Sequence, residues 1–172
     1  LNRLSFKAKI GLLVAAAILA VLVMAVTAAL QSRTQITEAR QQQLVTAVQA
    51  AHGVVMGFQA KAAKGEMSEA DAKQAAADAV GMSRYGGPEG KTEYFYIWTL
   101  DGVGVMHPIR KEWNGQNMIG KVKDGAGVDI IVALIDGMKK SRDGRAFVPT
   151  NFPRPGSTEP VPKLQYIIKV DG

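Results

Sequence analysis

The sequence predicts an α+β protein in which a membrane-crossing helix runs into a long outer helix, followed by a domain of antiparallel strands. Three observations support this class. Residues 10–30 carry no charged side chain. Residues 33–64 repeat apolar side chains every three or four positions, which is the period of a helix. Beyond residue 92 the apolar period becomes two, which is the period of a strand.

Composition excludes several functional classes. The 172 residues contain no cysteine, so disulfides, thiolate metal sites and cysteine nucleophiles are absent. The net charge is +6, but Arg3, Lys7 and Lys9 precede the apolar run, and without them 18 positive residues face 15 negative ones, a balance of +3. Since no basic stripe is interleaved with aromatic residues, a nucleic-acid partner is not expected.

The apolar run "IGLLVAAAILAVLVMAVTAAL" at 10–30 is long enough to cross a hydrocarbon core of roughly 30 Å. A cleaved signal peptide is the alternative, but its apolar region spans only about 7–15 residues. The basic residues before the run predict that residues 1–9 stay in the cytoplasm and that everything after about residue 32 lies outside the inner membrane.

The membrane helix is expected to continue outward as one rod of more than 50 residues, because no proline interrupts residues 1–87. Such a rod cannot bury its apolar stripe alone, so it needs the following domain, a partner rod or both, and we expect a homodimer through this helix. The stripe consists of Val45, Val48, Ala51, Val55, Phe58 and Ala62.

Gly65 is expected to end the rod, and Ser68 with Asp71 forms an approximate capping box for a short Ala-rich helix that ends near Val80. Residues 84–91 are predicted as a turn-rich connector. In the strand that follows, one face carries Tyr94, Tyr96, Trp98 and Leu100, and the other carries Phe95, Ile97 and Thr99.

The second half of the chain alternates turns, one helix and further strands. A turn at "LDGVG" leads to a second strand ending near His107, and residues 109–125 are predicted as a loop. A helix is expected over 128–140, a strand over 146–152, a proline-rich loop over 153–162 and a strand over 164–170. Because the chain stops inside a strand–turn pattern, at least one further strand is expected beyond it.

No enzyme chemistry is predicted. Gly-x-Ser-x-Gly is absent, His52 and His107 lack the spacing of metal ligands, and "GVG" at 102–104 lacks the lysine and helix of a phosphate loop. No cofactor is expected.

A binding pocket remains, because such sites combine aromatic walls with a few convergent polar groups. Tyr96 and Trp98 offer walls, His107 a ring nitrogen donor, and Lys163 a cation for an anionic ligand. The candidate ligand-binding residues are Tyr96, Trp98, His107, Lys163, Tyr166 and Arg84. The alternatives are that His107 caps a turn, Lys163 lies on the surface, and Arg84 is solvated or ion-paired.

Several segments together resemble a known family. They are "RYG" at 84–86, "YFYIWTLDGVGVMHP" at 94–108, "NGQNM" at 114–118, "DGRAFVPTNFPRPG" at 143–156 and "PVPKLQYIIKV" at 160–170. Their order resembles that of the periplasmic single-Cache domain, type 2, of bacterial methyl-accepting chemotaxis proteins. The resemblance covers residues 33–172.

The resemblance implies a long N-terminal helix packed on a PAS-like antiparallel sheet, with a pocket for acids such as acetate, propionate, lactate or pyruvate. It also implies a last strand, a second membrane helix, a HAMP linker and a cytoplasmic signalling domain beyond residue 172. This chain departs from the family pattern around Trp98 and Thr99 and at 150–152, so the usual ligand does not carry over directly.

These expectations combine into a membrane-anchored sensor that holds a two- to four-carbon carboxylate between Lys163 and His107. Tyr96, Trp98 and Tyr166 would surround the short tail of the acid. Three alternatives stay open: the sensor of a histidine kinase or nucleotide cyclase, a module that senses a periplasmic binding protein, and an envelope enzyme.

Overall fold

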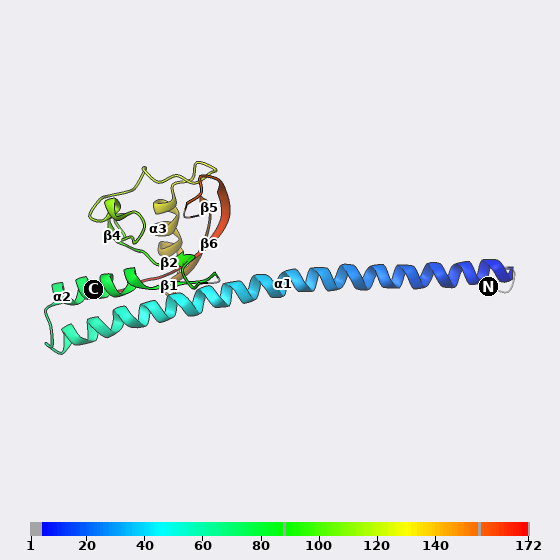
Figure 1. The fold of residues 1–172 in the computed structure, drawn as a ribbon, viewed down its shortest axis with the longest axis horizontal. Coiled ribbons are helices and arrows are strands. Elements are labelled where there is room, and N and C mark those ends of the chain that lie inside the picture. The colour runs from blue at the N-terminus through cyan, green and yellow to red at the C-terminus, as the bar shows by residue number, and fades with distance from the viewer. Residues whose placement is uncertain (1–4, 88, 155, 172) are drawn as a thin grey trace. The chain divides into compact units, whose positions relative to one another are not determined.

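A computed structural model describes residues 5–87, 89–154 and 156–171 (Figure 1). The parts of the predicted segments at residues 1–4, 88, 155 and 172 lie outside the described residues. The chain divides into two compact units, Leu1–Gln43 and Leu44–Gly172. The second unit contains every element that bears on a ligand site.

Helix α1, Phe6–Ala63, is continuous over 58 residues, which confirms the predicted rod. It is long and apolar enough to cross a membrane by length and composition. None of its described residues is buried, and leucines such as Leu13 and Leu19 are exposed along the apolar run.

Helix α2, Glu69–Met82, begins at the predicted cap, because the Ser68 hydroxyl accepts the backbone N–H of Asp71 at 3.0 Å. Alanines line its buried side and allow close packing. A small cluster of Ala77, Val80 and Met106 packs against Ala51 and Val55 of α1, and against Phe95 and Ile97. Within the second unit, this cluster covers part of the stripe that the sequence predicts on α1.

The described strands form three two-stranded antiparallel sheets, where the sequence predicted one PAS-like sheet. Sheet β1–β2 joins Arg84–Tyr85 to Glu93–Tyr94, and β3–β4 joins Ile97–Trp98 to Gly104–Met106. The predicted strand over 94–100 is therefore interrupted, and the predicted connector contains β1. The interruption has a packing reason, since Phe95 turns to stack on Tyr85 with ring centroids 4.9 Å apart.

Strands β5, Arg145–Pro153, and β6, Pro160–Ile168, form the longest pair, with a register running from Arg145 opposite Ile168 to Pro153 opposite Pro160. Both strands extend into the segment predicted as a proline loop. Pro153 and Pro160 form the last pair of the ladder, next to the loop that connects the two strands, where a missing N–H removes no interior bond.

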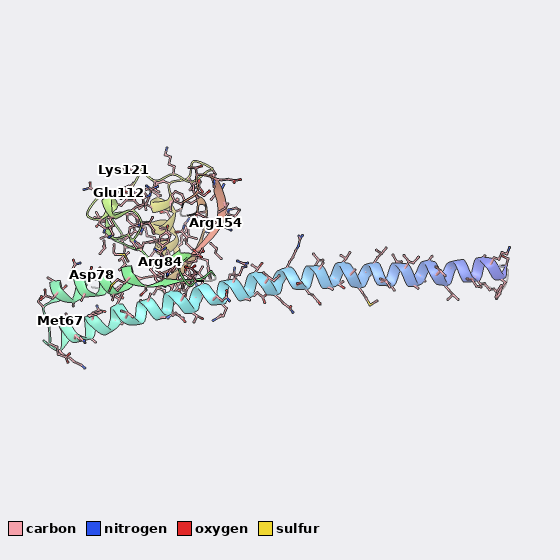
Figure 2. All side chains as sticks on the ribbon, in the orientation of Figure 1. Met67, Asp78, Arg84, Glu112, Lys121 and Arg154 are labelled. Carbon is pink, nitrogen blue, oxygen red and sulfur yellow. The ribbon has the colours of Figure 1, made fainter. Side chains whose placement is uncertain are left out.

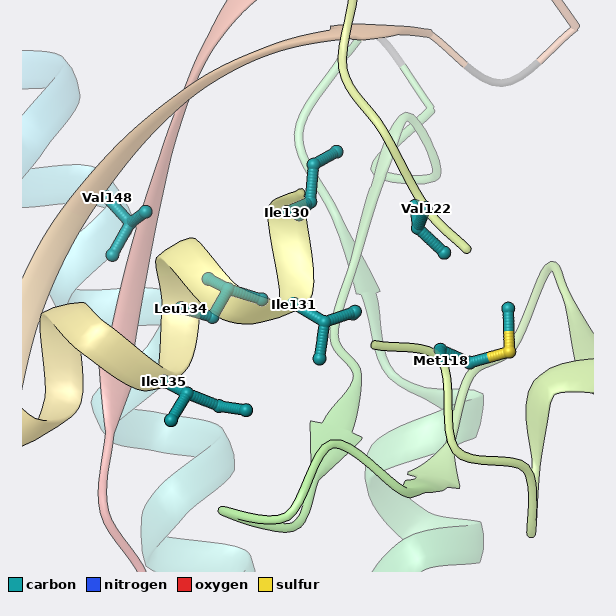
Figure 3. Close-up of a cluster of buried hydrophobic side chains, with 7 residues drawn as sticks. All are labelled: Met118, Val122, Ile130, Ile131, Leu134, Ile135 and Val148. Atoms are coloured by element: carbon teal, nitrogen blue, oxygen red, sulfur yellow. The ribbon is translucent and has the colours of Figure 1, made fainter. Parts of the chain in front are cut away.

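Helix α3, Ile130–Lys140, begins at Asp129, whose side chain accepts the backbone N–H of Val132 at 3.1 Å. It forms the centre of the α3 core, in which Ile131 is only 1% exposed. Figure 3 shows this core of aliphatic side chains from α3, β5 and the preceding loop: Met118, Val122, Ile130, Ile131, Leu134, Ile135 and Val148.

Candidate functional site

Five rings gather on one side of the second unit, at the segments 94–98 and 107–113. We call Tyr94, Tyr96, Trp98, His107 and Trp113 the aromatic cluster. His107 lies at its centre and is 5% exposed, with ring centroids 5.3 Å from Tyr94, 6.0 Å from Tyr96, 6.4 Å from Trp98 and 5.0 Å from Trp113. The period-two pattern that predicted one shared face for the first three rings is thus consistent with the geometry.

Backbone contacts fix the orientation of His107. Its Nδ1 accepts the backbone N–H groups of Ile109 at 3.3 Å and Arg110 at 3.0 Å, while its own backbone N–H donates to Oδ1 of Asn114 at 2.8 Å. Burial lowers the pKa of His107 to about 4, and the nearby charge of Arg110 acts in the same direction. The ring is therefore neutral at pH 7 and carries its proton on Nε2, as a hydrogen-bond donor.

Trp113 enters the cluster from the 3-10 helix Lys111–Trp113, in a segment predicted only as loop. Gly104 makes this close approach feasible, because a Cβ there would lie 2.5 Å from the carbonyl oxygen of Trp113. The backbone N–H of Gly115 donates to the Gly104 carbonyl at 2.7 Å and holds the loop in place. Sequence reasoning missed Trp113; the signal was a large aromatic residue six positions after His107.

The β5–β6 pair adds a polar face to the aromatic cluster. Thr150 lies opposite Lys163 in the register, and alternation places Gln165 on the same face. The Gln165 Nε2 donates to the Thr150 hydroxyl at 2.9 Å, and its Oε1 accepts the Tyr96 hydroxyl. Burial raises the pKa of Tyr96 far above its usual value, so this hydroxyl remains a donor. Thr150 and Gln165 were not predicted as site residues.

Lys163 lies at the edge of this polar face and is half-buried. Its ammonium donates to the Pro153 carbonyl at 2.8 Å and stands 5.8 Å from the centroid of the Phe152 ring. Burial lowers its pKa, opposed by the negative charge of Glu93. An ammonium has three N–H donors, so two remain for an anion at this edge of the polar face.

Arg84 borders the aromatic cluster, with its guanidinium 5.4 Å from the centroid of the Tyr94 ring. Figure 2 labels this residue where it lies near the start of the strand region. One terminal nitrogen donates to the Lys91 carbonyl at 3.0 Å. Its Nε is buried and has no hydrogen-bond partner among the described residues, so Arg84 retains a donor at the border of the cluster.

Tyr166 is not brought to the aromatic cluster. Its ring packs on Phe147, with centroids 4.8 Å apart, and the register pairs these two residues directly. Because strand side chains alternate, a residue three positions after Lys163 faces the opposite side of the hairpin. Because Lys163 and Tyr166 are three residues apart in a predicted strand, the sequence alone could have predicted that they face opposite sides.

The described residues contain no group of three His, Asp or Glu side chains placed to hold a metal ion. A hollow of about 410 Å³ lies beside α3 and β5, and no residue of the aromatic cluster lines it. The cluster itself brings together a neutral ring donor, a hydroxyl donor, a nearby cation and apolar walls. This chemistry suits non-covalent binding of a small anion.

Comparison with protein families matches the model described as Single Cache domain 2 over residues 36–172. The chain belongs to this family. Cache domains of this family are non-catalytic, which agrees with the absence of an enzyme motif. The α+β architecture, with a long N-terminal helix against small antiparallel sheets, is the Cache fold of this chain.

Two solved structures are similar to this chain in both fold and sequence. A periplasmic sensor domain of a chemotaxis protein is 35% identical, with a TM-score of 0.68 over 76% of this chain and 86% of that one. A second is a Cache chemosensory domain solved for its recognition of carboxylic acids. It is 28% identical, with a TM-score of 0.69 over 78% of this chain and 86% of that one.

The methyl-accepting chemotaxis protein McpP of Pseudomonas putida is 26% identical over 169 residues, which are 97% of this chain. The chain spans 29% of the length of that relative. The Cache domain described here is therefore related to the sensor domains of chemotaxis receptors.

Proposed function

We propose that this Cache domain is the periplasmic sensor of a transmembrane chemoreceptor and binds a two- to four-carbon carboxylate at the aromatic cluster. The observation that carries the proposal is the neutral His107 donor, surrounded by four rings and adjoining a polar face that includes Lys163. A structural relative that recognises carboxylic acids supports the same ligand class.

Each polar group has a role in this proposal. The ammonium of Lys163 neutralises the carboxylate, while Nε2 of His107 and the hydroxyl of Tyr96 donate hydrogen bonds. Charge-assisted hydrogen bonds of this kind are roughly twice as strong as neutral ones. Trp98 and Trp113 form the apolar walls, and the guanidinium of Arg84 supplies a second positive charge at the border. Tyr166 has no part in the proposed site.

The arrangement in the membrane follows the charge pattern. Residues 1–9 remain in the cytoplasm, residues 10–30 cross the inner membrane, and residues 33–172 form the periplasmic domain. The outer part of α1 pairs with that of a second copy in a homodimer, which would cover the residues of its stripe that α2 leaves exposed. The chemotaxis output is favoured over a kinase or cyclase by the resemblance to McpP.

A second candidate function is docking of a periplasmic binding protein. It is favoured by one observation, which is that the chain's own Gln165 occupies the space between the Tyr96 and Thr150 hydroxyls. Titration with free acids separates the two functions.

The test is isothermal titration calorimetry of the full chain in lipid nanodiscs, with acetate, propionate, lactate and pyruvate. Acetamide and propionamide serve as uncharged controls of matched shape. We expect a saturable heat from at least one acid and none from the amides. A folded protein that gives no heat with any acid would reject the carboxylate proposal and leave docking of a binding protein.

A further inference from the structure

The Gln165 side chain occupies the polar face of the site in the manner of a ligand. The side chain of glutamine has the carbon skeleton and the amide group of propionamide. Its carboxamide group has nearly the same shape as a carboxylate. Its Oε1 accepts the Tyr96 hydroxyl and its Nε2 donates to the Thr150 hydroxyl at 2.9 Å. Thr150 is 8% exposed, so these contacts are made away from bulk water.

We propose that Gln165 is an internal competitor that determines the affinity and size selectivity of the carboxylate site. The inference depends on the proposed function of that site. Both hydroxyls that hold the carboxamide are able to donate to the two oxygens of a carboxylate, because hydroxyl hydrogens rotate to suit the acceptor. A free acid that takes this place must first separate Gln165 from Tyr96 and Thr150.

The register explains why this place suits an anion better than an amide. Lys163 lies directly opposite Thr150, on the same face of the hairpin, and its ammonium, which donates to the Pro153 carbonyl at 2.8 Å, keeps two N–H donors for an anion. The neutral carboxamide gains no charge pairing there, whereas an ionised acid does. Because each hydrogen bond makes only a modest net contribution, two broken bonds lower the apparent affinity of the free acid by roughly tenfold.

Competition also links binding to movement of β6. When the acid enters, the Gln165 side chain must leave, and the strand that carries it loses its contact with Tyr96. The same residue limits ligand length, because its two methylene groups fill space that the tail of a longer acid would need. A shorter side chain should therefore favour the three-carbon acids over acetate.

The experiment compares wild type with Gln165→Ser and Gln165→Asn by calorimetry of the full chain in nanodiscs, using the same four acids. Serine frees the space of an acetamide unit, and asparagine keeps the amide but shortens its reach by one methylene. We expect affinity to rise about tenfold in Gln165→Ser and less in Gln165→Asn, with the largest gain for the longer acids. Leu164→Ser, on the opposite face of the same strand, is the control and should leave affinity unchanged.

Circular dichroism verifies that each variant is folded. Wild type that binds an acid, with equal or weaker binding in both folded Gln165 variants, would overturn the competitor proposal and leave the proposed function intact. If no protein binds any acid, both proposals fail. Tighter binding in Leu164→Ser as well would show that the gain reflects a loosened strand, and that too would overturn the role of Gln165.

Discussion

The α3 core is buried, whereas the aromatic cluster is half-buried around the buried His107, and the two differ in the chemistry of their side chains. The α3 core contains seven apolar residues, and their side chains have no nitrogen or oxygen atoms. The aromatic cluster also contains polar atoms that form specific hydrogen bonds. For example, Nδ1 of His107 accepts hydrogen bonds from two backbone N–H groups. The two regions are in contact, since Tyr96, Trp98 and Trp113 pack against the α3 core. Because their side chains differ in chemistry, substitutions in the core should affect stability more, and substitutions in the cluster should affect recognition more.

The largest effect is expected in the α3 core. Replacing Ile131 with alanine removes a side chain that is 1% exposed and leaves a cavity, which should lower the free energy of unfolding by about 3–4 kcal/mol. Chemical denaturation measures the loss. Val132→Ala, at a neighbour 37% exposed, is the control and should cost less than about 1 kcal/mol. Equal losses in both variants would contradict the assignment of the core.

The second effect is a pH dependence that is expected of the aromatic cluster and not of the α3 core. The pKa of His107 is about 4 in the folded protein and about 6.5 when unfolded. Between these values the unfolded chain binds a proton that the folded chain does not, so stability is retained above pH 6.5 and falls as the pH drops towards 4. We expect a loss of roughly 2 kcal/mol across this range.

His107→Gln is the matched variant for this measurement, because glutamine does not titrate. Urea denaturation at several pH values should show that the difference in stability between wild type and variant changes between pH 6.5 and 4. Parallel curves for the two proteins over that range would show that the ring is not held neutral by burial.

A smaller effect is expected for the cation at the edge of the polar face. Lys163→Met keeps most of the aliphatic stem but removes the charge, and affinity for the carboxylate should fall about tenfold or more. Lys169→Met removes an exposed lysine near the end of the same strand and is the control. Calorimetry should show near wild-type affinity for the control. Full affinity in Lys163→Met would remove that lysine from the site.

The smallest effect is expected at Tyr166, which packs on Phe147 on the other face of the hairpin. Tyr166→Ala should change acid affinity by less than about twofold, although it should cost some stability through lost packing. A large loss of affinity, with stability unchanged, would show that the two faces of the hairpin are not functionally separate.

Sequence periodicity was sufficient for the helices. The rod, the Ser68 cap and the helix predicted over 128–140 follow from local patterns; the structure confirms the rod and the cap and has the helix at Ile130–Lys140. Strand length was harder, because the interruption near Phe95 depends on Tyr85, which approaches only after the chain has folded. Prolines at 153 and 160 indicate a loop by local propensity, yet the ladder between β5 and β6 accommodates them.

In the candidate site, too, some residues could be predicted from local sequence and others depend on contacts made only in the folded chain. Tyr96, Trp98 and His107 were predicted as one group because they lie within one short segment, and the structure brings them together. Thr150 and Gln165 could not be predicted in that way, because they are brought to the site by the pairing register of β5 and β6, which exists only in the folded protein. Trp113 depends on the close approach that Gly104 permits.

Tryptophan emission tests the central claim most directly. The chain has only two tryptophans, Trp98 and Trp113, and both belong to the aromatic cluster, with ring centroids 6.2 Å apart. Titration with propionate should give a saturable change in emission, and propionamide at equal concentration should give none. If propionate and the other three acids leave the emission of the folded protein unchanged, or if the amide has the same effect as the acid, then this cluster does not recognise a carboxylate.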